Sequence, residues 1–467
     1  MYFLPIFLII YYLSPRVLKN YVILAASIFF YAWGAPKFVF VVIGSVILDF
    51  YIIQTMHRNK NILHKKLLLT LSLSINILLL LYFKYANFFI ENVNAVLSDL
   101  GYHNVTWTEV ALPIGISFYT FQTLTYSIDV YRKVHEPLKN PVDYLVYILL
   151  FPQMIAGPIV RFNQIADEIT DRRKNETIDN RLLGFYRFAI GLAKKVLIAN
   201  VMGAEADKIF AMQQVDLNTS IAWIGIIAYT FQIYFDFSGY SDMAIGIGRM
   251  IGFTFPENFN NPYISRNITE FWRRWHMTLG SWMRDYLYIP LGGSRVKTKT
   301  RLYFNLWLVF LVSGLWHGAA WNFVIWGAFH GFFLILDRLF LEKLLNKLGK
   351  FTSILFTFLV TVVGWVLFRA ESFEQIKYYL KTMFDFNFDF KPYAVQNNFW
   401  TILIIAVIFS FITAFKFGLK IEKFVFFSKQ YNFTQNIISS FVILLLLFIS
   451  ISSITSSGFN PFIYFRF

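Results

Sequence analysis

The residues best suited to chemistry are histidines in apolar surroundings. His317 stands between Trp316 and Gly318 in the run FLVSGLWHGAAWNFVIWGAFHG. An imidazole is costly to place in a membrane-type segment, so such residues usually face a bundle interior or a water-filled cavity. Histidine can act there as a general base or as a nucleophile near neutral pH. The alternative is a packed ring bonded to a neighbouring carbonyl, and this run alone leaves both interpretations open.

A second histidine, His276, lies in segment 256–301, which is too polar to span a membrane. Asn267 or Thr269 could cap a helix that runs to about residue 288. In that helix Trp272 and His276 would share one face, with Leu279 and Gly280 next along it. We therefore expect one amphipathic helix at the cytoplasmic interface.

The same segment is strongly basic. Between residues 265 and 301 eight Lys and Arg stand against Glu270 and Asp285, a net charge of +6 with His neutral. These basic side chains could anchor lipid head groups, or they could draw in an anionic donor, and charge alone favours the anchor. The candidates for donor binding are Arg273, Arg274 and Arg284.

Charged side chains also occur inside a second apolar stretch, FDFSGYSDMAIGIGRMIGF, which contains Asp236, Asp242 and Arg249. Isolated carboxylates are disfavoured in lipid, so these should pair with basic residues or line an aqueous path. Structural pairing is the favoured interpretation. In FPQMIAGPIV, two prolines and a glycine predict a broken or re-entrant element over 151–160 beside a cavity, or an ordinary proline kink.

Composition places these elements in a membrane. The chain has 467 residues, of which 57% are hydrophobic and 15% charged, and its mean hydropathy is +0.53. No soluble core needs so much apolar surface, so we predict an all-α polytopic membrane protein. Cysteines are absent, which excludes disulfides and thiolate chemistry. The N-terminus has no cleavable signal peptide and resembles a first span. No nucleic-acid-binding motif accompanies the net charge of +15.

The loops predict an orientation. Basic residues without acidic ones occupy 14–19 and 56–66, whereas 91–110 has three acidic residues and no Lys or Arg. The positive-inside rule then puts 14–19 and 56–66 in the cytoplasm and the N-terminus outside. Candidate spans lie near 2–13, 20–34, 37–55, 66–90, 111–128, 142–160, 182–202, 219–240, 303–316, 319–340, 353–369, 399–416 and 437–456.

Several motifs together resemble one family. They are FPQMIAGPIVRF, YFDFSGYSDMAIGIGRMIGF, NPYISRNITEFWRRWHMTLGSWMRDYLYIPLGGSR, SGLWHGAAWNFVIWGAFHG, WVLFRAESF and the terminal FIYFRF. In this order they are similar to the membrane-bound O-acyltransferase superfamily, in its bacterial branch that contains the alginate O-acetylation membrane protein. The resemblance covers nearly the whole chain, and its 256–331 block is the most specific part.

The resemblance implies a fold and a site. The fold would be a single integral membrane domain of about 11–13 membrane helices with re-entrant and interfacial helices and a central tunnel. Residues 1–110 would form N-terminal helices, 111–340 the core and 341–467 C-terminal helices. His317 matches the family's catalytic histidine and His276 its second histidine. His330 also matches a histidine of this branch, although packing with a bonded ring nitrogen is favoured for it. The expected donor-binding or tunnel residues are Trp316, Gly318, Trp272, Arg273, Arg274, Trp275, Arg284, Asp236 and Asp242.

The function implied is acetyl transfer from cytoplasmic acetyl-CoA across the bacterial inner membrane to an extracytoplasmic polysaccharide such as an alginate-like polymer or peptidoglycan. The resemblance also implies an extracytoplasmic SGNH-hydrolase-like partner, so that contact with the polysaccharide is indirect. We expect no permanently bound cofactor and no metal, because no carboxylate motif supports a site at the three histidines. Two alternatives are D-alanyl transfer from a carrier-protein thioester to teichoic acid, and a polysaccharide-precursor transporter or flippase.

Overall fold

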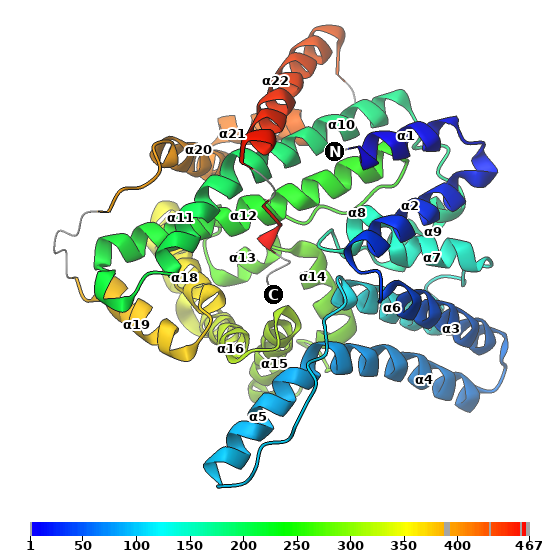
Figure 1. Ribbon diagram of the computed structural model, residues 1–467, viewed down its shortest axis with the longest axis horizontal. Coiled ribbons are helices and arrows are strands. Elements are labelled where there is room, and N and C mark those ends of the chain that lie inside the picture. The colour runs from blue at the N-terminus through cyan, green and yellow to red at the C-terminus, as the bar shows by residue number, and fades with distance from the viewer. Residues whose placement is uncertain (1, 387–392, 429–430, 458–459, 464–467) are drawn as a thin grey trace. The chain divides into compact units, whose positions relative to one another are not determined.

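The computed structural model describes residues 2–386, 393–428, 431–457 and 460–463, and these are helices joined by loops, without a strand (Figure 1). The predicted all-α class is confirmed. The chain divides into two compact units, 1–184 with 247–256, and 185–246 with 257–467. Helices α10 (Ile178–Ala193) and α12 (Thr219–Met250) contribute residues to both. The division into 1–110, 111–340 and 341–467 stays a prediction.

The first unit contains nine complete helices among its described residues. They are α1 (Phe3–Leu13), α2 (Lys19–Gly34), α3 (Val39–Arg58), α4 (Ile62–Leu80), α5 (Ala86–Asp99), α6 (Ile116–Tyr131), α7 (Pro141–Leu149), α8 (Phe151–Met154) and α9 (Phe162–Thr170). Local chemistry explains several starts. The side chain of Asn61 caps α4, and that of Asn140 caps α7, where Pro141 occupies the first turn.

The predicted break near residue 151 lies in this unit. Leu150 leaves the helical conformation between α7 and α8, and nearly all of 151–160 is buried. Hydrogen bonds compensate for the interruption, since the Gln153 side chain donates to the Tyr147 carbonyl and the Tyr147 hydroxyl donates to the Val160 carbonyl. Side chains therefore provide hydrogen-bond partners for backbone carbonyls that the interrupted helix leaves unpaired, as a buried irregular segment requires. A cavity beside it stays a prediction.

The second unit holds the remaining helices. They are α11 (Asn200–Phe210), α13 (Ile268–Arg274), α14 (Met277–Met283), α15 (Lys299–His317), α16 (Trp321–Leu336), α17 (Glu342–Leu348), α18 (Lys350–Arg369), α19 (Phe373–Phe384), α20 (Phe399–Phe411), α21 (Lys416–Phe427) and α22 (Phe433–Ser457). One hydrophobic core joins α12, α16 and α18, and it is rich in large rings such as Phe231, Trp326 and Trp365. Such rings contribute large buried areas.

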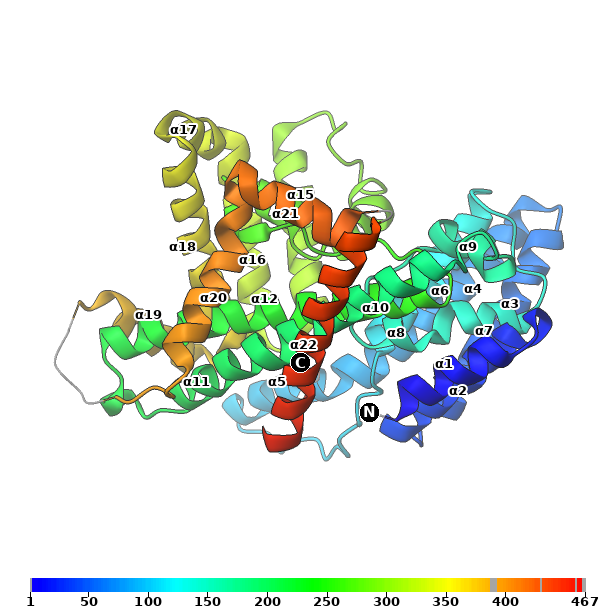
Figure 2. The same cartoon turned by 90° about the horizontal axis from the view of Figure 1, so that it is seen from above.

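Several helices meet the requirements for a membrane span. Among the described residues seven helical runs are long and apolar enough, or up to eight if one bent pair counts as a span. These runs are Arg16–Gly34, Val39–Arg58, Ile62–Asp99, Thr219–Met250, Trp321–Leu348, Lys350–Arg369 and Phe433–Ser456, and the pair is Phe399–Ala414 with Lys416–Phe427, bent by 101° (Figure 2). The number is below the predicted 11–13 because helices such as α1 and α6 are short, α7 and α8 are divided, and α10 and α11 carry charges.

The expected helix from about 267 to 288 is wrong in one respect. Asn267 does cap α13, accepting from the Glu270 N–H at 2.7 Å. The helix then stops, Trp275 is extended, and His276 is left-handed with φ 45° before α14 begins. Trp272 and His276 therefore do not share one helix face, and the i,i+4 relation does not apply across this junction.

Candidate active site

His317 is the last residue of α15, at the turn into α16, and it is 7% exposed. Two glycines permit this tight hairpin. A Cβ at position 314 would lie 2.2 Å from the Phe323 carbonyl oxygen, and one at Gly318 would lie 2.0 Å from the Phe323 ring. Real side chains cannot occupy that space, so α15 and α16 come together only with glycine at both positions.

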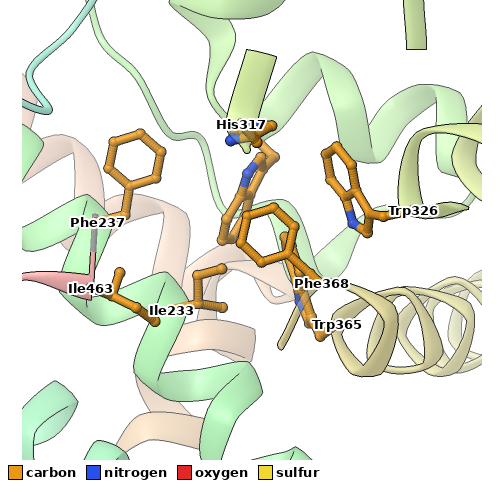
Figure 3. Close-up of a pocket in the computed structure, with 8 residues that line it drawn as sticks. Ile233, Phe237, His317, Trp326, Trp365, Phe368 and Ile463 are labelled. Atoms are coloured by element: carbon orange, nitrogen blue, oxygen red, sulfur yellow. The ribbon is translucent and has the colours of Figure 1, made fainter. Parts of the chain in front are cut away.

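The His317 ring faces a small cavity enclosed by aromatic side chains (Figure 3). The ring centroids of Trp326 and Phe368 lie 5.2 and 5.3 Å from its own. Its lining comes from α12, α16, α18, the end of α15 and two loop residues: Ile233, Phe237, Trp275, His317, Trp326, Trp365, Phe368 and Ile463. The free space among these side chains is about 20 Å³ for the centre of a water molecule, so the cavity suits a group of a few heavy atoms and not a nucleotide.

His276 is 1% exposed and lies beside this cavity, with its ring centroid 4.7 Å from Phe237 and 6.5 Å from His317. Its Nδ1 is 3.0 Å from the side-chain oxygen of Asn258. That atom is identified as oxygen because it also accepts from the backbone N–H of Thr278 at 3.3 Å. Because a carbonyl oxygen only accepts, Nδ1 of His276 carries the ring proton.

The other ring nitrogen of His276 is then an acceptor. Nε2 is buried and has no hydrogen-bond partner among the described residues. Burial lowers the pKa of His276 below its ordinary value, because an imidazolium would lose its hydration among these rings. The side chain is thus a neutral imidazole with an open lone pair, which can accept a proton from a small molecule but is poorly suited to donate one.

The His276 side chain makes no capping hydrogen bond at the start of α14, and Asn258 supplies these bonds instead. Its side-chain oxygen accepts from the Thr278 N–H and hydroxyl, and its backbone carbonyl accepts from the Met277 N–H at 2.9 Å. Its amide donates to the Ser241 hydroxyl at 3.0 Å. Asn258, which is not part of α14, therefore caps this helix and also fixes the orientation of the His276 ring.

Comparisons with known proteins identify the family of this chain. Residues 45–342 match the model of MBOAT, the membrane-bound O-acyltransferase family. The chain belongs to the membrane-bound O-acyltransferase family. It is 40% identical to a probable alginate O-acetylase of Pseudomonas putida over 100% of this chain and 98% of that protein. Identity is 45% to a probable alginate O-acetylase of Azotobacter vinelandii, over 82% and 76% of the two chains. A peptidoglycan O-acetyltransferase of Helicobacter pylori is 38% identical over 82% and 78%.

Four predicted residues of this acyltransferase lie around the two histidines. Trp316 packs against both rings, with centroids 4.9 Å from His317 and 6.1 Å from His276. Gly318 ends α15, and Trp275 lines the cavity. Trp272 lies one layer away, against Trp326 at 5.4 Å.

The third histidine that the sequence resemblance singled out is in a different setting. His330 is fully buried, and its centroid lies 4.9 Å from Trp272 and 5.2 Å from Trp326. Its predicted packing is present, but neither ring nitrogen has a hydrogen-bond partner among the described residues. Among all residues that the structure describes, no group of three or more His, Cys, Asp or Glu could hold a metal ion.

The two carboxylates of α12 lie in ion pairs. Asp242 contacts Arg187 and Lys194, each at 2.6 Å, and Arg187 also contacts Glu257 at 2.6 Å. Asp236 contacts Lys195 at 2.5 Å. This agrees with the structural pairing that the sequence favours, whereas the three basic partners were not predicted. Their signal was present, because α10 and the turn after it carry cations in an otherwise apolar stretch.

The predicted donor-binding arginines lie on α13 and after α14. Arg273 is exposed, Arg274 pairs with Glu270 at 2.9 Å, and Arg284 pairs with Asp285 at 2.7 Å. The Arg284 guanidinium is exposed, and its pair is weak and screened by salt, whereas Arg274 is half-buried and also donates to the Asn260 carbonyl at 3.1 Å. Arg273 and Arg284 are therefore the more accessible of the three to an anionic ligand.

The sequence did not reveal most of the cavity lining. Phe237, Trp365 and Phe368 belong to long apolar helices in which aromatic residues are abundant, so nothing in their spacing distinguishes them. Ile463 belongs to the terminal motif FIYFRF, of which residues 464–467 lie outside the described residues. Asn258 is in the loop before α13, where only its contact with His276 identifies it.

Proposed function

We propose that this acyltransferase takes acetyl from cytoplasmic acetyl-CoA and passes it across the membrane for O-acetylation of an extracytoplasmic polysaccharide. The observation that carries the proposal is the pair of buried histidines, one of them lining and the other packed against the wall of a small apolar cavity. The named relatives, alginate O-acetylases and a peptidoglycan O-acetyltransferase, support acetyl as the group transferred and a cell-envelope polymer as its destination.

His317 acts on the acyl group in this proposal. Either it takes the proton of an acceptor hydroxyl, or it carries the acetyl transiently as acyl-imidazole. In the first case the hydroxyl oxygen bonds to the acetyl carbonyl carbon, the carbon–sulfur bond breaks, and CoA leaves as a thiolate that takes up a proton. In the second case the imidazole nitrogen bonds to the acetyl carbonyl carbon first and CoA leaves as the thiolate. The acceptor oxygen then attacks the same carbon, the carbon–nitrogen bond breaks, and the imidazole takes the hydroxyl proton.

His276 assists through its open lone pair. Its imidazole centroid is 6.5 Å from that of His317, so the two rings do not bond directly and can act on one small group from two sides. The neutral form with its proton on Nδ1 supports a proton-accepting or orienting role over protonation of the donor. The aromatic wall excludes water, which protects a thioester or acyl-imidazole from hydrolysis.

The charged part of the donor stays outside the cavity. Only a few heavy atoms fit beside His317, so the phosphates of CoA remain near the basic segment 265–301, with Arg273, Arg274 and Arg284 as their partners. We place this segment in the cytoplasm and the N-terminus outside. Delivery to the polymer goes through an SGNH-hydrolase-like partner outside, so contact with the polysaccharide is indirect.

Membrane vesicles from the native cells test the proposal with radiolabelled acetyl-CoA. We expect CoA release and label in the envelope polymer, and loss of both by about 100-fold or more in His317→Ala at equal protein level and equal thermal stability. Carrier-bound D-alanine as donor should give no label. Retained acetylation in the His317→Ala strain would overturn the role of His317, and labelling from the D-alanyl carrier alone would overturn the donor.

A single engineered cysteine tests the orientation, since the chain has none of its own. Replacing the exposed Lys297 with Cys should give a thiol that membrane-impermeant maleimide reaches in inverted vesicles and not in intact cells. Labelling in intact cells alone would contradict the cytoplasmic location of segment 265–301.

A further inference from the structure

One wall of the His317 cavity comes from a residue far away in the chain. Ile463 is 5% exposed and lines the cavity together with Ile233 of α12 (Figure 3). The other lining side chains are five large aromatic rings, which have few conformations, and His317 itself. The two isoleucines are therefore the aliphatic part of the lining, where a change in side-chain volume alters the free space most simply.

The backbone of Ile463 is fixed by a buried ion pair. Its N–H donates to Asp236 Oδ2 at 2.9 Å, while Lys195 Nζ donates to Asp236 Oδ1 at 2.5 Å and to the Pro461 carbonyl at 3.0 Å. The side chains of Asp236 and Lys195 are only 3% and 7% exposed. Buried charges in such geometry hold their partners firmly, because losing either contact leaves an uncompensated charge.

Aromatic contacts hold the same segment from the side. The Phe462 ring lies 4.8 Å from Lys195 Nζ and meets Tyr240 edge-on at 5.0 Å. Phe462 thus packs on Lys195 of the ion pair and on Tyr240 of α12. The segment is attached through one charged pair and one ring, and this leaves the Ile463 side chain in a defined place in the cavity wall.

We propose that Ile463, positioned by the Asp236–Lys195 pair, limits the length of the acyl group that His317 can accept. This inference rests on the proposed function and adds a specificity-determining residue to it. Because the free space beside His317 is small, we expect an extra methylene to fit only when a wall residue shrinks. Ile463→Ala removes three carbon atoms, so propionyl should then fit. One methylene in a tight apolar pocket changes selectivity by roughly 10- to 200-fold.

The test measures CoA release by full-length protein in proteoliposomes from acetyl-CoA, propionyl-CoA and butyryl-CoA. We expect Ile463→Ala to raise the ratio of propionyl to acetyl turnover by about tenfold or more. Ile463→Val should raise it less, and the double variant Asp236→Leu with Lys195→Met, which removes the hydrogen bonds to Ile463 and Pro461 without leaving a lone charge, should raise it in part. Ile376→Ala is the matched control, since Ile376 on α19 is 4% exposed and lies outside the cavity, and its ratio should stay unchanged.

Two outcomes separate the failures. An unchanged ratio in Ile463→Ala or Ile463→Val, with acetyl turnover retained, would overturn the role of Ile463 and leave the proposed function intact. If the wild-type protein releases no CoA from any of the three donors in a His317-dependent manner, the proposed function itself fails. A variant that does not fold is replaced by the milder Ile463→Val, whose shift must have the same direction.

Discussion

Helix α12 borders two different buried environments within a few residues, the cavity beside His317 and a set of ion pairs. Around Ile233 and Phe237 the neighbours are two buried histidines and aromatic rings next to a cavity, whereas Asp236 and Asp242 lie in ion pairs. Formal charges in a membrane protein are matched so that they hold helices together. The neutral His276, in contrast, has an Nε2 without a hydrogen-bond partner among the described residues, and its ring packs against Phe237 of the cavity wall. We interpret the matched charges as architecture and propose a chemical role for the open acceptor of His276.

The largest effect on the architectural side should come from Asp242→Asn. This change leaves the half-buried Lys194 without its carboxylate, while Arg187 keeps Glu257. We expect a loss of about 1.5–3 kcal/mol in unfolding free energy, because two charge-assisted hydrogen bonds to the Asp242 carboxylate are lost or weakened. Thermal unfolding in detergent measures it.

The double variant Asp242→Asn with Lys194→Met is the control, since it removes the orphaned cation as well. Stability should recover in large part, and acetylation per folded molecule should stay near the wild-type value. A single variant that unfolds normally but loses acetylation would show that Asp242 belongs to the chemistry instead.

On the chemical side, Asn258→Ala should lower turnover by about 10-fold to 100-fold, as loss of an orienting partner does at other sites. The His276 ring then loses the acceptor that fixes its proton on Nδ1. Asn258→Asp keeps an acceptor for both His276 and Thr278, so it should retain most of the turnover. Its carboxylate favours the imidazolium and raises the pKa of His276, so the acid limb of the pH–rate profile should move to higher pH. A purely structural Asn258 would leave the profile unmoved.

A smaller effect is expected at the surface. Replacing Arg273 and Arg274 with Gln should raise the apparent KM for acetyl-CoA several-fold and change kcat less, because the attraction to phosphates is long-range and screened. The difference from wild type should shrink at high salt. A fall in kcat at unchanged KM would place these residues nearer to the reaction than the structure does.

The smallest effect should follow from His330→Leu. Leucine fills a similar volume among Trp272 and Trp326 and removes two ring nitrogens that have no partner in the described chain. Stability should stay equal or rise by up to about 1 kcal/mol, and acetylation should persist. Loss of acetylation with an unaltered melting temperature would show that His330 takes part in the reaction and is not only a packing residue.

The two regions also differed in how far the sequence could predict them. Hydropathy and motif order located the helices, and the family resemblance singled out His317 and His276. The partners of Asp236 and Asp242 were harder to predict, because Lys195 and Asp236 are 41 residues apart and only tertiary packing brings them together. The break at His276 was missed because neither Trp275 nor His276 is a helix breaker by type. Ile463 was missed because a cavity wall depends on shape, which composition does not record.

The left-handed backbone of His276 has a practical consequence for genetics. At φ 45° most side chains are strained, and asparagine is among the few non-glycine residues that tolerate this conformation. Alanine at this position would change the backbone preference and remove the imidazole at the same time. Asparagine would remove the imidazole alone, so a phenotype of His276→Asn can be attributed to the lost ring nitrogen, whereas one of His276→Ala cannot.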